Sequence, residues 1–299
     1  PGATEFGYAP EPVYRVLGPG SSVPLNRHVE GARSDWDASI DELIAVCPNL
    51  ARVGLVVAWF GDDLRAPDCT IMPAVTDRTT QTAPRAWQAA GLSRATARLI
   101  SSVDGRPAFG GSPSDISIIR AIRDLTERGI AVTLYPFVMM DVPAGNGRDD
   151  PYGGVEQAAY PWRGRMTLSL APGIDGSPDT SAAAADEIAA FVGTAAAADF
   201  GAAGDAVTYS GPAEWSYRRF ILHLAKLAAI AGGVDAFLIG SEMRGLTTVR
   251  SSSASYPFVD ALVALAADVR SLLPAAKISY AADWSEYFGH HPVDGSGDV

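Results

Sequence analysis

The chain of 299 residues is acidic, with 34 Asp and Glu residues against 23 Lys and Arg and a formal net charge of −11. This charge disfavours binding to nucleic acid or to an anionic membrane surface, and it suits a neutral substrate or a protein partner better. No apolar run reaches the roughly 18 residues of a membrane span. We expect Cys47 and Cys69 to be reduced thiols, and the four histidines show no metal-ligand spacing, so the sequence predicts no metal and no cofactor.

The first half of the chain predicts two buried strands and three helices. Residues 1–33 form a Gly- and Pro-rich entry segment with one apolar stretch near 13–17. Ser34 is a typical cap for a helix over 35–46, and residues 52–60 are typical of a strand buried on both faces. A long loop follows. Further elements are expected as helices over 93–102 and 114–128 and a strand over 130–139.

The second half continues the alternation after another long loop over 140–180. Helices are expected over 180–198, 212–231 and 257–273, and strands over 234–241 and 277–281. Apolar strands that alternate with amphipathic helices indicate an α/β fold with a parallel sheet. The chain begins with Pro1 rather than Met and ends in a loop sequence over 294–299, so we interpret it as a fragment of a longer polypeptide.

The strongest functional signal is the segment AFLIGSEMR, residues 236–244. A short buried strand ends in a Gly-Ser pair, and Glu242 and Arg244 follow where the chain leaves the strand. Catalytic groups of β/α barrels occupy this position. Glycoside hydrolysis needs one carboxylic acid as proton donor and a second carboxylate, so Glu242 is a candidate acid. The alternative is a structural salt bridge between Glu242 and Arg244.

Aromatic and charged residues near the other strand ends are candidates for sugar binding. Aromatic rings stack on the flat faces of sugars, although a single aromatic residue is more often part of the core. The aromatic candidates are Trp59, Phe60, Tyr135, Phe137, Tyr160, Trp162, Trp284 and Tyr287. The charged candidates are Asp62, Asp63, Asp141, Arg163 and Asp283, each of which has the alternative of being a solvated loop charge.

Several long motifs resemble the TIM-barrel-like domain of the large baseplate protein of gene transfer agents, which are tailed-phage-like particles. They are GLVVAWFGDDLR (54–65), TLYPFVMMD (133–141), PYGGVEQAAYPWRG (151–164), DAFLIGSEMRGL (235–246) and ISYAADWSEYFGHHP (278–292). The resemblance implies a (β/α)8 TIM barrel, present here as an N-terminal portion of about five of its eight strands. Residues 1–33 would be an entry segment that holds the first strand, and residues 34–299 the incomplete barrel.

The same resemblance implies a cellular setting. The protein would belong to the tail baseplate of a virion-like particle assembled in the bacterial cytoplasm. Its partners would be other baseplate or tail proteins, a glycan substrate or receptor on the recipient cell, and further copies of itself in a trimer.

A more distant similarity to β-mannanase-type glycoside hydrolases implies residue roles. Glu242 matches the general acid/base, and the positions that line the sugar cleft are matched by Trp162, Arg163, Asp283 and Trp284. The nucleophile of that group ends strand seven, which lies beyond this chain, and Glu286 is a poor substitute. We therefore expect the chain by itself to lack glycosidase activity. The alternative function is a non-catalytic structural or receptor-binding baseplate module on a hydrolase fold.

Overall fold

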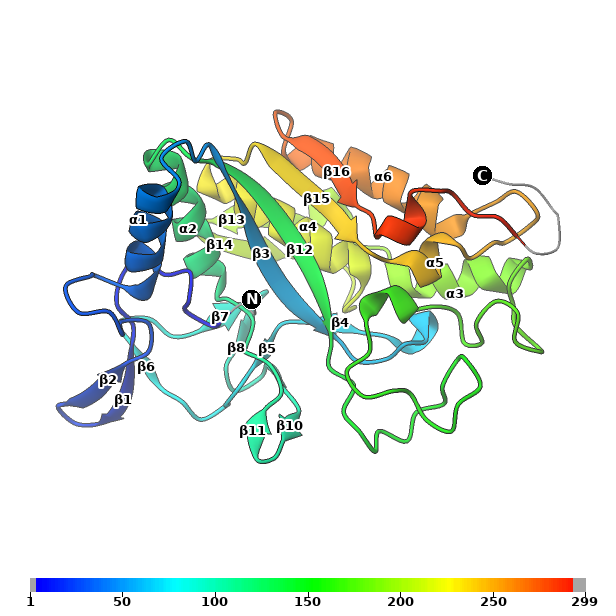
Figure 1. The fold of residues 1–299 in the computed structure, drawn as a ribbon, viewed down its shortest axis with the longest axis horizontal. Helices are drawn as coiled ribbons and strands as arrows, with labels where there is room; N and C mark the ends of the chain where they lie inside the picture. Colours follow the sequence, from blue (N-terminus) through cyan, green and yellow to red (C-terminus); the bar gives the residue numbers. More distant parts are fainter. Residues whose placement is uncertain (1–3, 293–299) are drawn as a thin grey trace.

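The computed structural model describes residues 4–292 and shows an α/β fold built on one parallel sheet (Figure 1). The long strands of this sheet are β3 (Arg52–Gly61), β12 (Ala131–Met140), β15 (Ala236–Ser241) and β16 (Lys277–Ala281). They lie side by side in chain order and run parallel. A doubly wound sheet reverses its strand order part-way, whereas a β/α barrel keeps it. The predicted fold class, part of a TIM-barrel-like arrangement, is confirmed.

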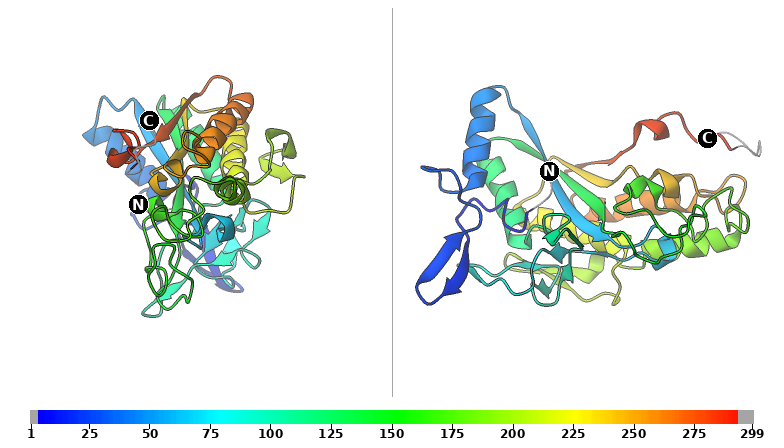
Figure 2. Two further views of the ribbon diagram at one scale, coloured as in Figure 1. Left: turned by 90° about the vertical axis from the view of Figure 1, so that its right-hand side faces the viewer. Right: turned by 60° about the horizontal axis from the view of Figure 1, so that its bottom comes forward.

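The helices are α1 (Asp35–Val46), α2 (Asp115–Glu127), α3 (Ala182–Val192), α4 (Tyr217–Ala231) and α6 (Pro257–Leu272). Of these, α2, α4 and α6 pack against one face of the sheet, and α3 packs against α4 and α6 (Figures 1 and 2). Because side chains alternate along a strand, Leu134 and Val138 of β12 are buried toward the helices, whereas Tyr135 and Phe137 lie half-buried on the opposite face. That opposite face corresponds to a barrel interior.

The strand expected within residues 1–33 forms, but it does not join the parallel sheet. β1 (Tyr14–Gly18) pairs antiparallel with β2 (Ser21–Pro24) and β6 (Thr82–Ala83), and the β1–β2 hairpin projects from one end of the molecule (Figure 2). The edge of β3 where a first barrel strand would lie is used otherwise. β4 (Ile71–Met72) pairs antiparallel with its end, and the Tyr8 hydroxyl donates a hydrogen bond to the Val56 carbonyl. Within residues 4–292 the sheet therefore has four parallel strands rather than five.

Two helix predictions need correction. Residues 93–102 form no helix, because Arg98 lies in the short strand β9 (Arg98–Leu99) and its guanidinium donates to the Phe60 carbonyl and to Asp62. These tertiary contacts override local propensity. Helix α4 begins at Tyr217, capped by the Ser216 hydroxyl, rather than at residue 212.

The remaining short elements lie in the connections between the long strands and helices. They are β5 (Ala74–Val75), β7 (Gln88–Ala89), β8 (Leu92–Ser93), β10 (Ser102–Val103), β11 (Arg106–Pro107), β13 (Phe200–Ala203), β14 (Ala206–Tyr209) and α5 (Arg244–Thr247). Single 3-10 turns are η1 (Ala66–Asp68), η2 (Arg163–Arg165), η3 (Ala197–Asp199) and η4 (Trp284–Glu286). The loop expected over 294–299 lies outside the described residues.

The two cysteines differ sharply in environment, which leads to a prediction. Cys47 is exposed, whereas Cys69 is buried, and burial together with the charge of Asp62 raises the pKa of the Cys69 thiol to about 12. Because the thiolate is the reactive form, we expect iodoacetamide at pH 8 to modify Cys47 and to spare Cys69 in the folded protein. Mass spectrometry should find one modified cysteine in buffer and two in denaturant. Equal modification of both in buffer would contradict this burial.

Candidate functional site at the C-terminal ends of the strands

Glu242 directly follows β15 and adopts an unusual backbone conformation. Its φ is +52°, in the left-handed region that residues other than glycine rarely occupy. Its amide donates to the carbonyl of Ala281 at 2.9 Å, which ties the turn to the end of β16. Such conformations persist only where surrounding contacts hold them, and they are frequent at functional sites. The Glu242 side chain is about one-third exposed.

Arg163 is the main partner of Glu242. It begins η2, in the long loop after β12, and its side chain is buried. Its Nη2 lies 2.8 Å from Oε2 of Glu242, and its Nε donates to the carbonyl and the hydroxyl of Ser241 at 2.9 and 3.1 Å. The guanidinium also stacks over the ring of Phe137 with its Cζ 3.8 Å from the ring centroid. One side chain thus connects the ends of β12 and β15.

Trp162 adds a second donor to the same carboxylate oxygen. Its Nε1 donates to Oε2 of Glu242 at 2.8 Å, and the ring remains 40% exposed. The ring folds over Gly164, where an added Cβ would lie 2.4 Å from ring atoms. Gly245 of α5 is equally confined, because a Cβ there would lie 2.2 Å from the carbonyl oxygen of Met166. These two glycines therefore allow α5 and η2 to pack closely.

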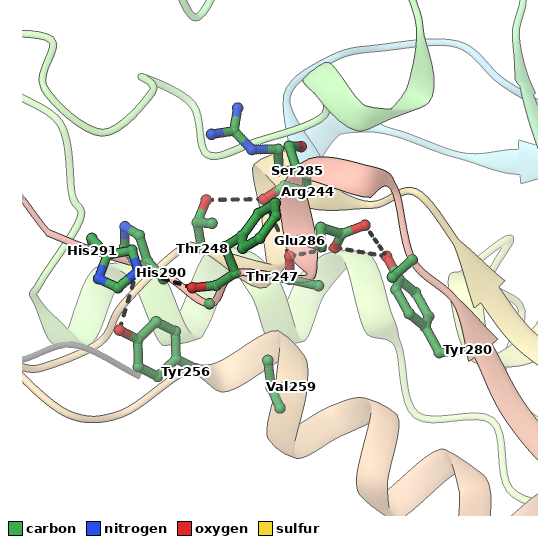
Figure 3. A pocket seen from close by; sticks show the side chains of 13 residues that line it. Arg244, Thr247, Thr248, Tyr256, Val259, Tyr280, Ser285, Glu286, His290 and His291 are labelled. Carbon is green, nitrogen blue, oxygen red and sulfur yellow. Dashed lines mark hydrogen bonds between the residues drawn. The ribbon is translucent and has the colours of Figure 1, made fainter.

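A second carboxylate, Glu286, lies in η4 and is hydrogen-bonded by neighbouring groups (Figure 3). Its Oε1 accepts from the hydroxyls of Thr247 and Tyr280 at 2.8 and 3.1 Å, and its Oε2 accepts from the amide of Asp283 at 2.8 Å. Burial raises the pKa of Tyr280, so its phenol stays protonated and donates. Both oxygens of Glu286 are thus committed to holding η4 against α5, as befits a positioning residue rather than a nucleophile.

Adjoining cavities surround this cluster, and Arg244 lines three of them. One of about 620 Å³ is bounded by Arg244, Tyr280 and Glu286 (Figure 3), and one of about 400 Å³ by Tyr152, Trp162, Arg165 and Arg244. A more open hollow of about 450 Å³ is bordered by Trp162, Arg244, Asp283, Trp284 and Ser285. We call these three hollows the cleft; Glu242 does not line them, but Trp162, which donates to its carboxylate, lines two of them.

The structure therefore brings together most of the residues predicted at the later strands. Glu242, Phe137, Trp162 and Arg163 are in direct contact, and Arg244, Asp283 and Trp284 border the adjoining hollow. Hydrogen bonds from the hydroxyl and the amide of Ser285 lower the pKa of Asp283. The alternative salt bridge between Glu242 and Arg244 is replaced by the pair with Arg163. Tyr135 lies beside Phe137, with ring centroids 5.7 Å apart.

Three predicted residues make contacts with other parts of the protein instead of lining the cleft. Trp59 is 0% exposed and packs against Phe220 and His223 on the helix side of the sheet. The carboxylate of Asp62 accepts from Thr70 and Arg98, and the buried carboxylate of Asp141 accepts from Ser101.

Sequence reasoning missed Tyr152, Arg165 and Thr247. Arg165 follows Trp162 and Arg163 in the motif WRGR, so its place in the same turn could have been inferred. Tyr152 and Thr247 carry no comparable signal: Tyr152 reaches the cleft through the packing of a long loop, and Thr247 is at the end of the short helix α5.

Within residues 4–292, no three His, Cys, Asp or Glu side chains gather as a metal site would require. In the same range, no helix has both the length and the apolar character needed to cross a membrane.

One segment of the chain matches a known protein family. Residues 215–299 match the family model of the GTA TIM-barrel-like domain. The resemblance to this domain is thereby confirmed over that segment. The matched residues include Glu242, Arg244, Asp283 and Trp284, whereas Trp162 and Arg163 precede them.

Two solved structures are similar to the chain. A complex of a GH113 β-1,4-mannanase is 15% identical, covers 83% of this chain and 50% of its own, and has a TM-score of 0.40. A second GH113 β-1,4-mannanase structure is 16% identical, covers 82% and 49%, and has a TM-score of 0.39. The chain thus spans about half the length of these mannanases. No protein in the curated set matches it.

The pair between Glu242 and Arg163 generates a stability prediction. Glu242→Gln leaves the buried guanidinium without its anionic partner, and we expect a loss of about 1–3 kcal/mol in the free energy of unfolding. Glu42→Gln, an exposed position of α1, is the matched control and should change this free energy by less than about 0.5 kcal/mol. Urea denaturation measures both. Equal effects of the two substitutions would show that the pair does not stabilise the fold.

Proposed function

We propose that the chain is the glycan-recognising part of a glycoside-hydrolase-like domain in the baseplate protein of a phage-like particle. There it acts on or binds a surface glycan of the recipient bacterium. One observation carries the proposal: the partly exposed carboxylate of Glu242, at the strand ends, accepts from the indole of Trp162, and the exposed side chains of Trp162 and Trp284 border one hollow. Carboxylates bind sugar hydroxyls and aromatic rings cover sugar faces, so this combination suits a saccharide.

The particle and its partners are proposed from the family match over residues 215–299. A gene-transfer-agent domain of this kind supports a location in the tail baseplate, contacts with other tail proteins and a trimeric assembly. The geometry of the cleft supports the proposal that the ligand is a glycan. These two lines of support are independent, because the first rests on the family and the second on the geometry around Glu242.

Two roles remain for Glu242 within this proposal. As a general acid/base it would protonate the leaving oxygen and later activate water, together with a second carboxylate about 5–5.5 Å away in a retaining enzyme. A purely binding role is the second candidate. It is favoured by the contacts of Oε2, which already accepts from Trp162 and Arg163, so that its lone pairs are directed to the protein.

The binding prediction concerns the two exposed indoles. Trp162→Ala and Trp284→Ala should each weaken saccharide binding roughly fivefold, because one stacking contact contributes about 1 kcal/mol. Leu17→Ala removes an exposed apolar side chain from β1, away from the cleft, and should leave the affinity unchanged. Titration followed by tryptophan fluorescence, or by calorimetry for the tryptophan variants, measures the affinities. Binding that is insensitive to both tryptophans would refute the cleft as the site.

The catalytic role is tested separately in the full-length baseplate protein. If Glu242 is the acid, Glu242→Gln should abolish glycan turnover while the affinity for the same glycan changes little. If the domain only binds, neither the wild-type protein nor the variant turns over any glycan that it binds. Reducing-end release from bound glycans, measured beside binding on a glycan array, distinguishes the two. Equal turnover by both proteins would remove Glu242 from catalysis.

A further inference from the structure

Two arginines at the cleft have no carboxylate partner. Both side chains are exposed, unlike those of Arg163 and Arg94, which are buried and pair with Glu242 and Glu5. Among residues 4–292, no Asp or Glu oxygen lies within 4.0 Å of the guanidinium of Arg165 or Arg244. Other exposed arginines, such as Arg106, also lack such a partner, but Arg165 and Arg244 share one cavity.

Both arginines line the same cavity of about 400 Å³, which lies next to Trp162. The guanidinium of Arg165 stacks over the ring of Tyr152, with its Cζ 4.2 Å from the ring centroid, and this contact orients the group without neutralising it. Arg244 begins α5, which the close approach at Gly245 holds against η2. Figure 3 shows the guanidinium of Arg244 pointing away from Glu286 and Tyr280.

Two like charges beside one cavity repel each other unless an anion lies between them. A guanidinium presents two parallel N–H donors that match a carboxylate or a phosphate, and such charge-assisted bonds are stronger than neutral ones. Tyr152 and Trp162 add aromatic faces to the same cavity. The local chemistry therefore favours a ligand that combines a sugar ring with a negative charge.

We propose that Arg165 and Arg244 form a subsite for the anionic substituent of an acidic saccharide. This inference rests on the proposed function, because it takes the saccharide at Glu242 as given and specifies its chemical class. It also modifies the expectation from net charge, which favoured a neutral ligand. The overall charge of −11 acts over the whole surface, whereas the two unpaired guanidinium groups determine what is bound within the cavity.

The test uses the 299-residue chain and pairs of saccharides of equal length, one member of each pair carrying anionic groups. β-1,4-Mannotriose is compared with β-1,4-trimannuronate, and N,N′-diacetylchitobiose with the N-acetylglucosamine–N-acetylmuramic acid disaccharide, which carries a lactyl carboxylate. Mannose 6-phosphate is compared with mannose to test for a phosphate. We expect at least one acidic member to bind at least tenfold more tightly than its neutral partner in calorimetry at low salt, and this ratio to fall as salt is raised.

The variants assign the effect to the two side chains. In Arg165→Gln/Arg244→Gln the ratio of acidic to neutral affinity should fall to near one. Arg244→Lys, which keeps the charge and loses the paired donors, should give an intermediate ratio. Arg106→Gln removes one positive charge at an exposed position of β11, as each single Arg→Gln variant does at the cavity, and should retain the full ratio. Circular dichroism checks the folding of each variant, and the single variants replace the double one if it misfolds.

Each outcome decides the inference. Equal affinity for acidic and neutral partners overturns it and leaves the proposed function intact. Binding of no saccharide at all removes both. A preference that survives in the double variant overturns the assignment to Arg165 and Arg244. A preference for the phosphate over the carboxylates supports the subsite and identifies phosphate as its anion.

Discussion

The arrangement of the cleft depends on the buried guanidinium of Arg163. It stacks on Phe137 of β12, donates to Ser241 at the end of β15 and pairs with Glu242. A buried guanidinium is costly unless its donors are paired, so the loop after β12 is held where all of these partners can be reached. Because Trp162 precedes Arg163 and Arg165 follows it, the same constraint brings an indole and a second guanidinium to the cleft. A long loop thereby acquires a defined conformation at one point.

The backbone at the end of β15 complements this constraint. The left-handed conformation of Glu242 costs energy, and the hydrogen bond from its amide to Ala281 and the one from the amide of Met243 to the hydroxyl of Tyr280 at 2.6 Å hold it in place. Tyr280 is in turn held by Glu286. The turn is therefore supported from β16 on one side and from Arg163 on the other, which keeps the carboxylate oriented while it remains partly exposed.

The sequence predicted those parts of the fold that depend on local patterns. The helix over 35–46 and the four buried strands follow from capping and from apolar runs, and the signal at Glu242 follows from a strand that ends in a charged residue. The helix expected over 93–102 failed because Arg98 is held by partners distant in sequence, the Phe60 carbonyl and Asp62. Local propensity carries no information about such partners.

The site predictions failed or succeeded according to which face of a strand a side chain occupies. Trp59 and Phe137 both lie near the C-terminal end of a buried strand, and composition does not distinguish them. The register aligns Phe137 with Ala58, one residue before Trp59, so the two rings lie on opposite faces of the sheet. A strand buried on both faces lacks the alternation that would reveal its orientation. Only the packing of the helices on one side determines that Trp59 enters the core and Phe137 faces Arg163.

The charge distribution shows why a property of the whole chain does not describe its cleft. Most of the acidic excess is distributed over the surface, where solvent and salt screen it within about 10 Å. At the cleft, Arg163 is matched by Glu242, whereas Arg165 and Arg244 lie beside aromatic rings, and within residues 4–292 no Asp or Glu oxygen lies within 4.0 Å of either guanidinium. For a ligand bound in the cleft, the hydrogen-bond donors of the nearby arginines contribute more than the net negative charge of the whole chain. The chemistry of binding is therefore decided by which arginines are already paired, and the pairing of Arg163 leaves its two neighbours available to a ligand.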